Sequence, residues 1–163
     1  MTPLSAAESE APKRHRVFLV DDQPIVRQGL TLLINQEPDL LVCGEANGNT
    51  SVLAALAALQ PDILVLDISF KGPDGIDVLK TIRSTDENLP ILVLSTDDES
   101  IYAERALRAG ANGYIMKQDA TDTVLVALRR FLRHELYVGE NIANRMRRQF
   151  VSGSTKGLPP TWE

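Results

Sequence analysis

Four short apolar runs divide the chain, and polar residues follow each of them. The runs are VFLV (17–20), ILVL (63–66), ILVL (91–94) and YIM (114–116), with a weaker fifth run, LLVC, at 40–43. Unbroken apolar runs of this length are typical of strands that are buried on both faces of a parallel sheet. The sequence therefore predicts five strands.

The segments between these runs have the spacing of amphipathic helices. Pro24 suits the first turn of one helix, residues 49–51 offer caps for the next, and Gly110 suits a helix C-terminus. The apolar residues expected on the buried faces are Ile25, Leu30, Leu33 and Ile34, then Val52, Leu56 and Leu59, then Ile76, Leu79 and Ile82, then Ile101, Ala106 and Leu107, and finally Val124, Leu125, Leu128 and Leu132.

Alternation of strands with helices favours an α/β fold, because parallel strands need long crossover connections that cover both faces of the sheet. We expect a doubly wound parallel sheet over residues 15–133. The flavodoxin-like strand order 2-1-3-4-5 is the common arrangement for five strands, and it places a ligand crevice at their carboxyl ends.

Three segments lie outside this domain. Residues 1–14 are expected to form a disordered N-terminal extension, and residues 152–163, rich in Gly, Pro and Ser, a flexible linker. Residues 134–151 predict an extra amphipathic linker helix, in which Ile142, Met146 and Phe150 recur every four residues. We expect that apolar side to pack on its own domain or on a second protomer.

Composition adds limits on the class of protein. The chain has 163 residues, of which 44% are apolar and 24% charged, as in ordinary soluble domains. Its longest apolar stretch, 52–59, is far short of the ~20 residues that cross a bilayer, and the N-terminus lacks a secretion signal. We therefore expect a cytoplasmic protein with no membrane contact. A single cysteine, Cys43, excludes an internal disulfide and a thiolate zinc site.

Charge is distributed unevenly along the chain. Residues 1–128 carry 10 basic and 19 acidic side chains, whereas residues 129–163 carry 7 basic and 3 acidic ones. The acidic character of residues 1–128 argues against binding of nucleic acid by this part of the chain, because such binding requires clustered Lys and Arg. The basic tail leaves two readings open for Arg145, Arg147 and Arg148, a solvated helix face or a contact with an acidic partner or DNA phosphates.

The residues that end the strands suggest chemistry. Asp21 and Asp22 follow the first strand, Asp67 the third, Ser95 the fourth and Lys117 the fifth. In a parallel sheet all of these meet at one edge, where three carboxylates repel one another unless a cation joins them. Mg²⁺ is the usual cation where phosphate is also bound. Carboxylate, metal, ammonium and hydroxyl around one point are the components of phosphoryl transfer.

Each of these residues also has a simple structural explanation. Asp21 or Asp22 would cap the helix that begins near Pro24, and Ser95 or Thr96 would cap the helix that follows the fourth strand. Asp67 would be a solvated turn residue and Lys117 an exposed loop lysine. Their joint position at one edge of the sheet, rather than any one of them, favours the functional interpretation.

Four segments resemble the signature blocks of response-regulator receiver domains, in the same order and at similar separations. They are LVDDQPIVRQGL, DILVLDISFKGPDGIDVL, PILVLSTDD and RAGANGYIMK, and the resemblance covers residues 15–133. The sequences DDQPIVRQGL and AGANGYIMKQDA are most similar to those of the NarL/FixJ (LuxR-type) branch of two-component regulators. Members of that branch usually carry a helix-turn-helix DNA-binding domain after the receiver, and no such sequence follows Phe150 here.

The resemblance implies specific roles. Asp67 would be the phosphoacceptor, which attacks the phosphohistidine of a sensor histidine kinase, and Lys117 would pair with the phosphoryl group. Mg²⁺ would be bound by Asp22 directly, by Asp21 through water or hydrogen bonds, by Asp67 and by the backbone carbonyl of Ser69. DNA would be reached only through a domain absent from this chain.

The resemblance also implies a switch. Ser95 would hydrogen-bond to the phosphoryl oxygens, and Tyr114 would rotate inward after it, so that the face formed by helix 4 and strand 5 changes shape and controls a transcriptional output. A homodimer is a possible result of that change. Tyr114 has an equally simple interpretation as a plain core aromatic.

Two positions depart from the family pattern. Lys71 stands where proline is usual, with Pro73 two places later, and Gln118 replaces a widespread proline after Lys117. We expect these to alter the lifetime of the phosphoryl group rather than abolish its transfer. Two alternatives remain: a pseudo-receiver that acts as a phosphorylation-independent dimerisation module, and a Mg²⁺-dependent phosphatase of the haloacid dehalogenase type, which would need an Asp where Ser69 stands.

Overall fold

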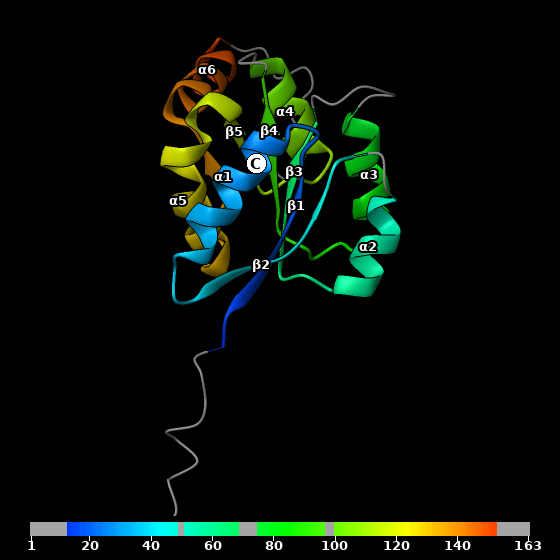
Figure 1. Cartoon of the computed structure of the whole chain (residues 1–163). Coiled ribbons are helices and arrows are strands. Elements are labelled where there is room, and N and C mark those ends of the chain that lie inside the picture. The colour runs from blue at the N-terminus through cyan, green and yellow to red at the C-terminus, as the bar shows by residue number, and fades with distance from the viewer. Residues whose placement is uncertain (1–12, 49–50, 69–74, 97–99, 153–163) are drawn as a thin grey trace, which may run out of the picture.

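The strands form one parallel sheet in the computed structural model, which describes residues 13–48, 51–68, 75–96 and 100–152 (Figure 1). The order across the sheet is β2-β1-β3-β4-β5-β6, and every neighbouring pair is parallel. Their bounds are β1 His15–Val20, β2 Leu40–Ala46, β3 Ile63–Asp67, β4 Ile91–Ser95, β5 Gly113–Met116 and β6 Tyr137–Val138.

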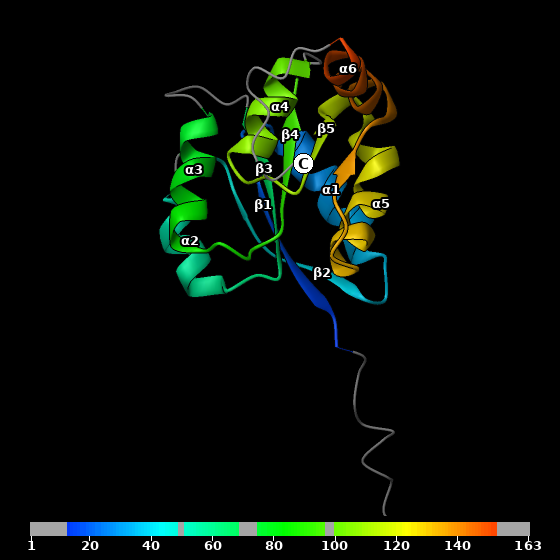
Figure 2. The same ribbon diagram turned by 180° about the vertical axis from the view of Figure 1, so that it is seen from behind.

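Helices cover both faces of this sheet (Figures 1 and 2). α1 and α5 pack on one face, and α2, α3 and α4 pack on the other. Their bounds are α1 Pro24–Asn35, α2 Val52–Leu59, α3 Gly75–Thr85, α4 Ser100–Arg108, α5 Ala120–Leu132 and α6 Glu140–Val151. The predicted doubly wound α/β fold of flavodoxin-like order is therefore confirmed, with one additional strand at the β5 edge.

The central strands show why this chain folds as a two-sided sheet. Every residue of β3 and β4 is buried. Successive side chains of a strand point to opposite faces, so Leu64 and Leu66 enter the core under α2 and α3, while Ile63 and Val65 enter the core under α1 and α5. Burial on both faces fixes the sheet in the middle of the molecule, and only its edges reach solvent.

Local signals in the sequence set the helix ends. Ser51 caps α2, since its hydroxyl accepts a hydrogen bond of 3.2 Å from the backbone N–H of Ala54. Gly110 has a φ of +109° just after α4, a conformation that favours glycine. The prediction was wrong for Ile25, which is 80% exposed; Val26 packs toward the core in its place.

The C-terminal part differs from the single helix predicted over 134–151. α6 begins only at Glu140, and residues 137–138 form β6, which extends the sheet beyond β5. A two-residue strand has no periodicity that a sequence pattern could reveal. Residues 1–12 and 153–163, with most of the predicted extension and linker, lie outside the described residues. None of the described helices is long and apolar enough to span a membrane.

Candidate functional site

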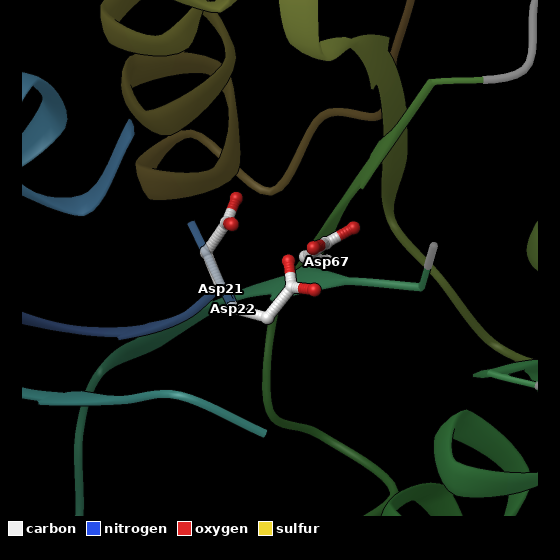
Figure 3. Close-up of side chains that lie close together, drawn as sticks. All are labelled: Asp21, Asp22 and Asp67. Atoms are coloured by element: carbon white, nitrogen blue, oxygen red, sulfur yellow. The ribbon is translucent and has the colours of Figure 1, made fainter. Parts of the chain in front are cut away.

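Three carboxylates from two strands meet at the carboxyl edge of the sheet. Asp21 and Asp22 directly follow β1, and Asp67 is the last residue of β3, the strand beside it. Figure 3 shows the three side chains grouped around one small region. One oxygen from each carboxylate lies within 4.8 Å of the others. The three carboxylates therefore lie close together at the carboxyl edge of the sheet, as the sequence predicted.

Lys117, the residue after β5, reaches into the same group. Its Nζ lies 2.9 Å from Oδ2 of Asp67 and 3.0 Å from Oδ1 of Asp21, and 3.9 Å from Oδ1 of Asp22. The side chains of Asp67 and Asp21 are 0% and 2% exposed and that of Lys117 is 7% exposed, whereas Asp22 is 43% exposed. Ion pairs in so buried a place interact more strongly than surface pairs. The alternative of an exposed loop lysine is excluded.

Burial and charge shift the protonation equilibria of this cluster. Burial raises the pKa of Asp21, with help from the negative charge of Asp67, although the backbone N–H of Gln23 and the Lys117 ammonium oppose the rise. Burial by itself would lower the pKa of Lys117, but its hydrogen bonds to Asp67 and Asp21 outweigh burial and raise that pKa. Lys117 therefore stays cationic at neutral pH.

The cluster fits a divalent cation. Oδ2 of Asp21 is buried and has no hydrogen-bond partner among the described residues, and an unsatisfied buried carboxylate oxygen is costly unless something binds it. All three side chains offer carboxylate oxygens, the ligands that Mg²⁺ prefers, and Asp22 remains open to solvent. Within the part of the chain that the structure describes, the three carboxylates share one ammonium, that of Lys117, so their negative charge exceeds its positive charge. Ser69, predicted to add a backbone carbonyl, lies outside the described residues.

Gln23 is a further member of the site that the sequence analysis missed. Its side-chain Oε1 accepts a hydrogen bond of 3.0 Å from Nζ of Lys117, and its backbone N–H donates one of 2.8 Å to Oδ1 of Asp21. Gln23 occupies the N-cap position of α1, yet its side chain does not cap that helix. Only its position between Asp22 and Pro24 could have indicated in the sequence that Gln23 belongs to the site, because its neutral amide adds no charge to the pattern of strand-end residues.

Ser95 and Tyr114 lie on neighbouring strands beside the cluster. Tyr114 pairs with Val93 of β4, and Ser95 is two residues further along that strand, so both side chains lie on the same side of the sheet. Ser95 is 1% exposed and Tyr114 is 0% exposed. Gln118 lies in a short 3-10 turn, Lys117–Asp119, that leads into α5. The other departure, Lys71, lies outside the described residues.

The fold and the site together define a receiver: a doubly wound parallel sheet with an acidic cluster and a buried lysine at its carboxyl edge. The sequence pattern of the response regulator receiver domain matches residues 17–129. The chain therefore belongs to the response-regulator receiver family, and its relatives place it in the NarL/LuxR-type branch that the resemblance indicated.

Two relatives illustrate the similarity. The chain is 36% identical to the transcriptional regulatory protein YxjL of Bacillus subtilis over 120 residues, which is 74% of this chain and 55% of YxjL. It is 31% identical to the nitrate/nitrite response regulator NarL of Escherichia coli K12 over 147 residues, 90% of this chain and 66% of NarL. The chain thus spans between about half and two thirds of these relatives.

A solved structure agrees with the sequence relatives. The LuxR-family two-component response regulator from Aurantimonas sp. SI85-9A1 superimposes with a TM-score of 0.79 at 32% identity. The match covers 85% of this chain and 99% of that one. The receiver fold described above is therefore shared over nearly all of that structure.

Proposed function

We propose that this chain accepts a phosphoryl group on Asp67 from the phosphohistidine of a sensor histidine kinase, in a reaction that depends on Mg²⁺. The observation that carries the proposal is a fully buried carboxylate 2.9 Å from a buried ammonium, with two further carboxylates within 4.8 Å. Family membership supports the same chemistry.

The chain's own residues have distinct roles in this reaction. An oxygen of Asp67 attacks the phosphorus, the P–N bond of the phosphohistidine breaks, and its electron pair returns to the imidazole nitrogen. Lys117, held by Asp21 and Asp67, offers positive charge to the equatorial phosphoryl oxygens. The cation would be held by Asp21, Asp22, Asp67 and the carbonyl of Ser69, and when bound it neutralises the charge that gathers on the transferred group.

The reaction is stoichiometric rather than catalytic with respect to the chain. Asp67 is consumed when the acyl phosphate forms and is regenerated when water hydrolyses it. The chain promotes both steps on itself, so it is a phosphoacceptor and not an enzyme that turns over an external substrate.

The output follows from the position of Ser95 and Tyr114. A phosphoryl group on Asp67 brings new acceptor oxygens near Ser95, whose hydroxyl would donate to one of them. Because Ser95 and Tyr114 share one side of neighbouring strands, movement of β4 toward Asp67 alters the space around Tyr114 and reshapes the face of α4 and β5. The name of YxjL, a transcriptional regulatory protein, supports a transcriptional output.

Intact-mass analysis after incubation with acetyl phosphate and Mg²⁺ tests the proposal. The chain should gain the mass of one phosphoryl group, Asp67→Asn should gain none, and Asp77→Asn, an exposed carboxylate on α3, should behave like the parent. A folded chain that gains no mass would support the pseudo-receiver. Steady release of phosphate from many esters would support the phosphatase instead.

A further inference from the structure

The ammonium of Lys117 has one close acceptor for each of its N–H donors. It carries three N–H bonds, and its Nζ lies 2.9 Å from Oδ2 of Asp67 and 3.0 Å from both Oδ1 of Asp21 and Oε1 of Gln23. Oδ1 of Asp22 is 3.9 Å away, which is too far for a hydrogen bond. Lys117 is therefore bonded to two carboxylates of the cluster and to one neutral amide, and the third carboxylate is left to other partners.

Asp22 is the carboxylate of the cluster that solvent reaches (Figure 3). Its side chain is 43% exposed, whereas those of Asp21 and Asp67 are 2% and 0% exposed. A cation that arrives from water would meet this carboxylate first. An ammonium hydrogen-bonded to Asp22 would have to be displaced before the same oxygen could bind the cation. Lys117 and a divalent cation are thus alternative partners for Asp22.

Gln23 determines where the third N–H of Lys117 points. If Oε1 of Gln23 were removed, a shift of about 1 Å would bring Nζ within hydrogen-bond distance of Oδ1 of Asp22. The flexible four-carbon stem of a lysine allows such a shift. A hydrogen bond from an ammonium to a carboxylate is also stronger than one to a neutral partner such as water. Asp22 is therefore the favoured replacement acceptor.

The backbone of Gln23 allows its side chain to be replaced without strain. Its φ of −94° and ψ of 108° are extended, as expected for a residue that precedes a proline. Its backbone N–H bonds to Oδ1 of Asp21 at 2.8 Å, and this bond does not depend on the side chain. Because the amide is neutral, its replacement by an apolar side chain leaves the net charge of the site unchanged. The contribution of Oε1 can therefore be measured separately.

We propose that Gln23 is a positioning residue for the cation. By accepting the third N–H of Lys117, it keeps the ammonium away from Asp22 and leaves this carboxylate available to Mg²⁺. The proposal rests on the cation site proposed above. Gln23 acts through Lys117 and does not itself contact the cation.

Titration of the full chain with Mg²⁺, followed by the NMR shifts of backbone amides, measures the effect. Gln23→Leu should raise the Kd for Mg²⁺ about three- to fivefold, because a partly exposed ion pair between Lys117 and Asp22 must break before the cation binds. Gln28→Leu makes the same exchange at another exposed position of α1 and should leave the Kd unchanged.

Lys117→Met distinguishes positioning from a general disturbance of the structure. With no ammonium to restrain, Gln23→Leu should leave the Kd of the Lys117→Met chain unchanged, whereas a disturbed junction of β1 and α1 would raise the Kd in both backgrounds. Asp22→Asn is a second background that does not require a chain without Lys117. Gln23→Leu should have no effect there either, because the carboxylate for which the ammonium and the cation compete is absent.

Two results would overturn this inference while the parent chain still binds Mg²⁺. One is an equal Kd for the parent and Gln23→Leu, and the other is the same loss of affinity in the parent and in either background. A parent chain that binds no Mg²⁺ would instead contradict the proposed cation site, and the role of Gln23 would fail with it.

Discussion

Lys117 shows how much of this site rests on one side chain. An ammonium has three N–H donors, and its Nζ lies within 3.0 Å of oxygens of Asp21, Gln23 and Asp67. Two of those partners are carboxylates that are almost fully buried. Without the ammonium, these two buried carboxylates would lose the positive charge that is hydrogen-bonded to both of them.

Lys117→Met should therefore destabilise the chain in the absence of metal. Removal of one partner from a buried ionic cluster costs about 3–5 kcal/mol, and we expect a loss of that order in the free energy of unfolding measured with urea in EDTA. Added Mg²⁺ should restore part of the loss, since the cation replaces the missing positive charge. Lys80→Met, at an exposed position of α3, should change stability by less than about 0.5 kcal/mol. Equal effects of the two variants would contradict this account.

Single residues also show which parts of the site a sequence can predict. Asp21, Asp67 and Lys117 could be found because strand ends in a parallel sheet converge, so position along the chain implies position in space. Gln23 could not, since its role depends on where a flexible, neutral side chain reaches. Oδ2 of Asp21 is buried without a hydrogen-bond partner in the described part of the chain, and this too depends on packing that no pattern of residue types reveals.

At the scale of elements, Gly113 determines whether β6 can join the sheet. A Cβ at this position would lie 2.7 Å from the carbonyl oxygen of Tyr137 and 2.9 Å from the ring of Phe131. The first of these atoms is backbone, so it cannot move without separating β6 from β5. Glycine is thus required here for the close approach of two strands.

Gly113→Ala should destabilise the chain by about 2 kcal/mol, the typical cost of an overpacked interior, and should raise hydrogen exchange at β6 and α6. Gly139→Ala is the matched control, because a Cβ there would have no atom of the described residues within 4 Å. Urea unfolding and exchange mass spectrometry measure both variants. A Gly113→Ala chain as stable as the parent would show that β6 is not held as the structure indicates.

The elements predicted well were those whose own residues carry the pattern. β3 and β4 are continuous apolar runs, and α3 buries Ile76, Leu79 and Ile82 as its spacing indicates. β6 is different, because only its pairing with β5 makes residues 137–138 a strand. The prediction for Ile25 was wrong for a related reason: an apolar residue in the first turn of a helix satisfies the spacing, but burial depends on what packs against it, and Val26 rather than Ile25 packs against the core.

For the whole molecule, a cation that binds only the folded chain must raise its thermal stability. Two of the three carboxylates that would hold it, Asp21 and Asp22, follow β1 and the third, Asp67, ends β3, so they are far apart along the sequence and meet only after folding. An unfolded chain has the same three carboxylates but does not hold them close together. Mg²⁺ should therefore act on the stability of the entire domain rather than on one loop.

This linkage gives a quantitative expectation for the melting temperature. Mg²⁺ at ten times its Kd should add about 1.4 kcal/mol to the free energy of unfolding, which corresponds to roughly 3 °C in Tm for a chain of this size. Asp22→Asn removes the exposed carboxylate of the cluster and should shrink the shift, while Asp77→Asn on α3 should preserve it. Scanning calorimetry across a Mg²⁺ series measures all three. A Tm of the parent that does not change with Mg²⁺, or a Tm that rises equally in Asp22→Asn, would mean that these carboxylates do not hold the cation, because loss of a ligand's charge must weaken the binding of a cation that it contacts.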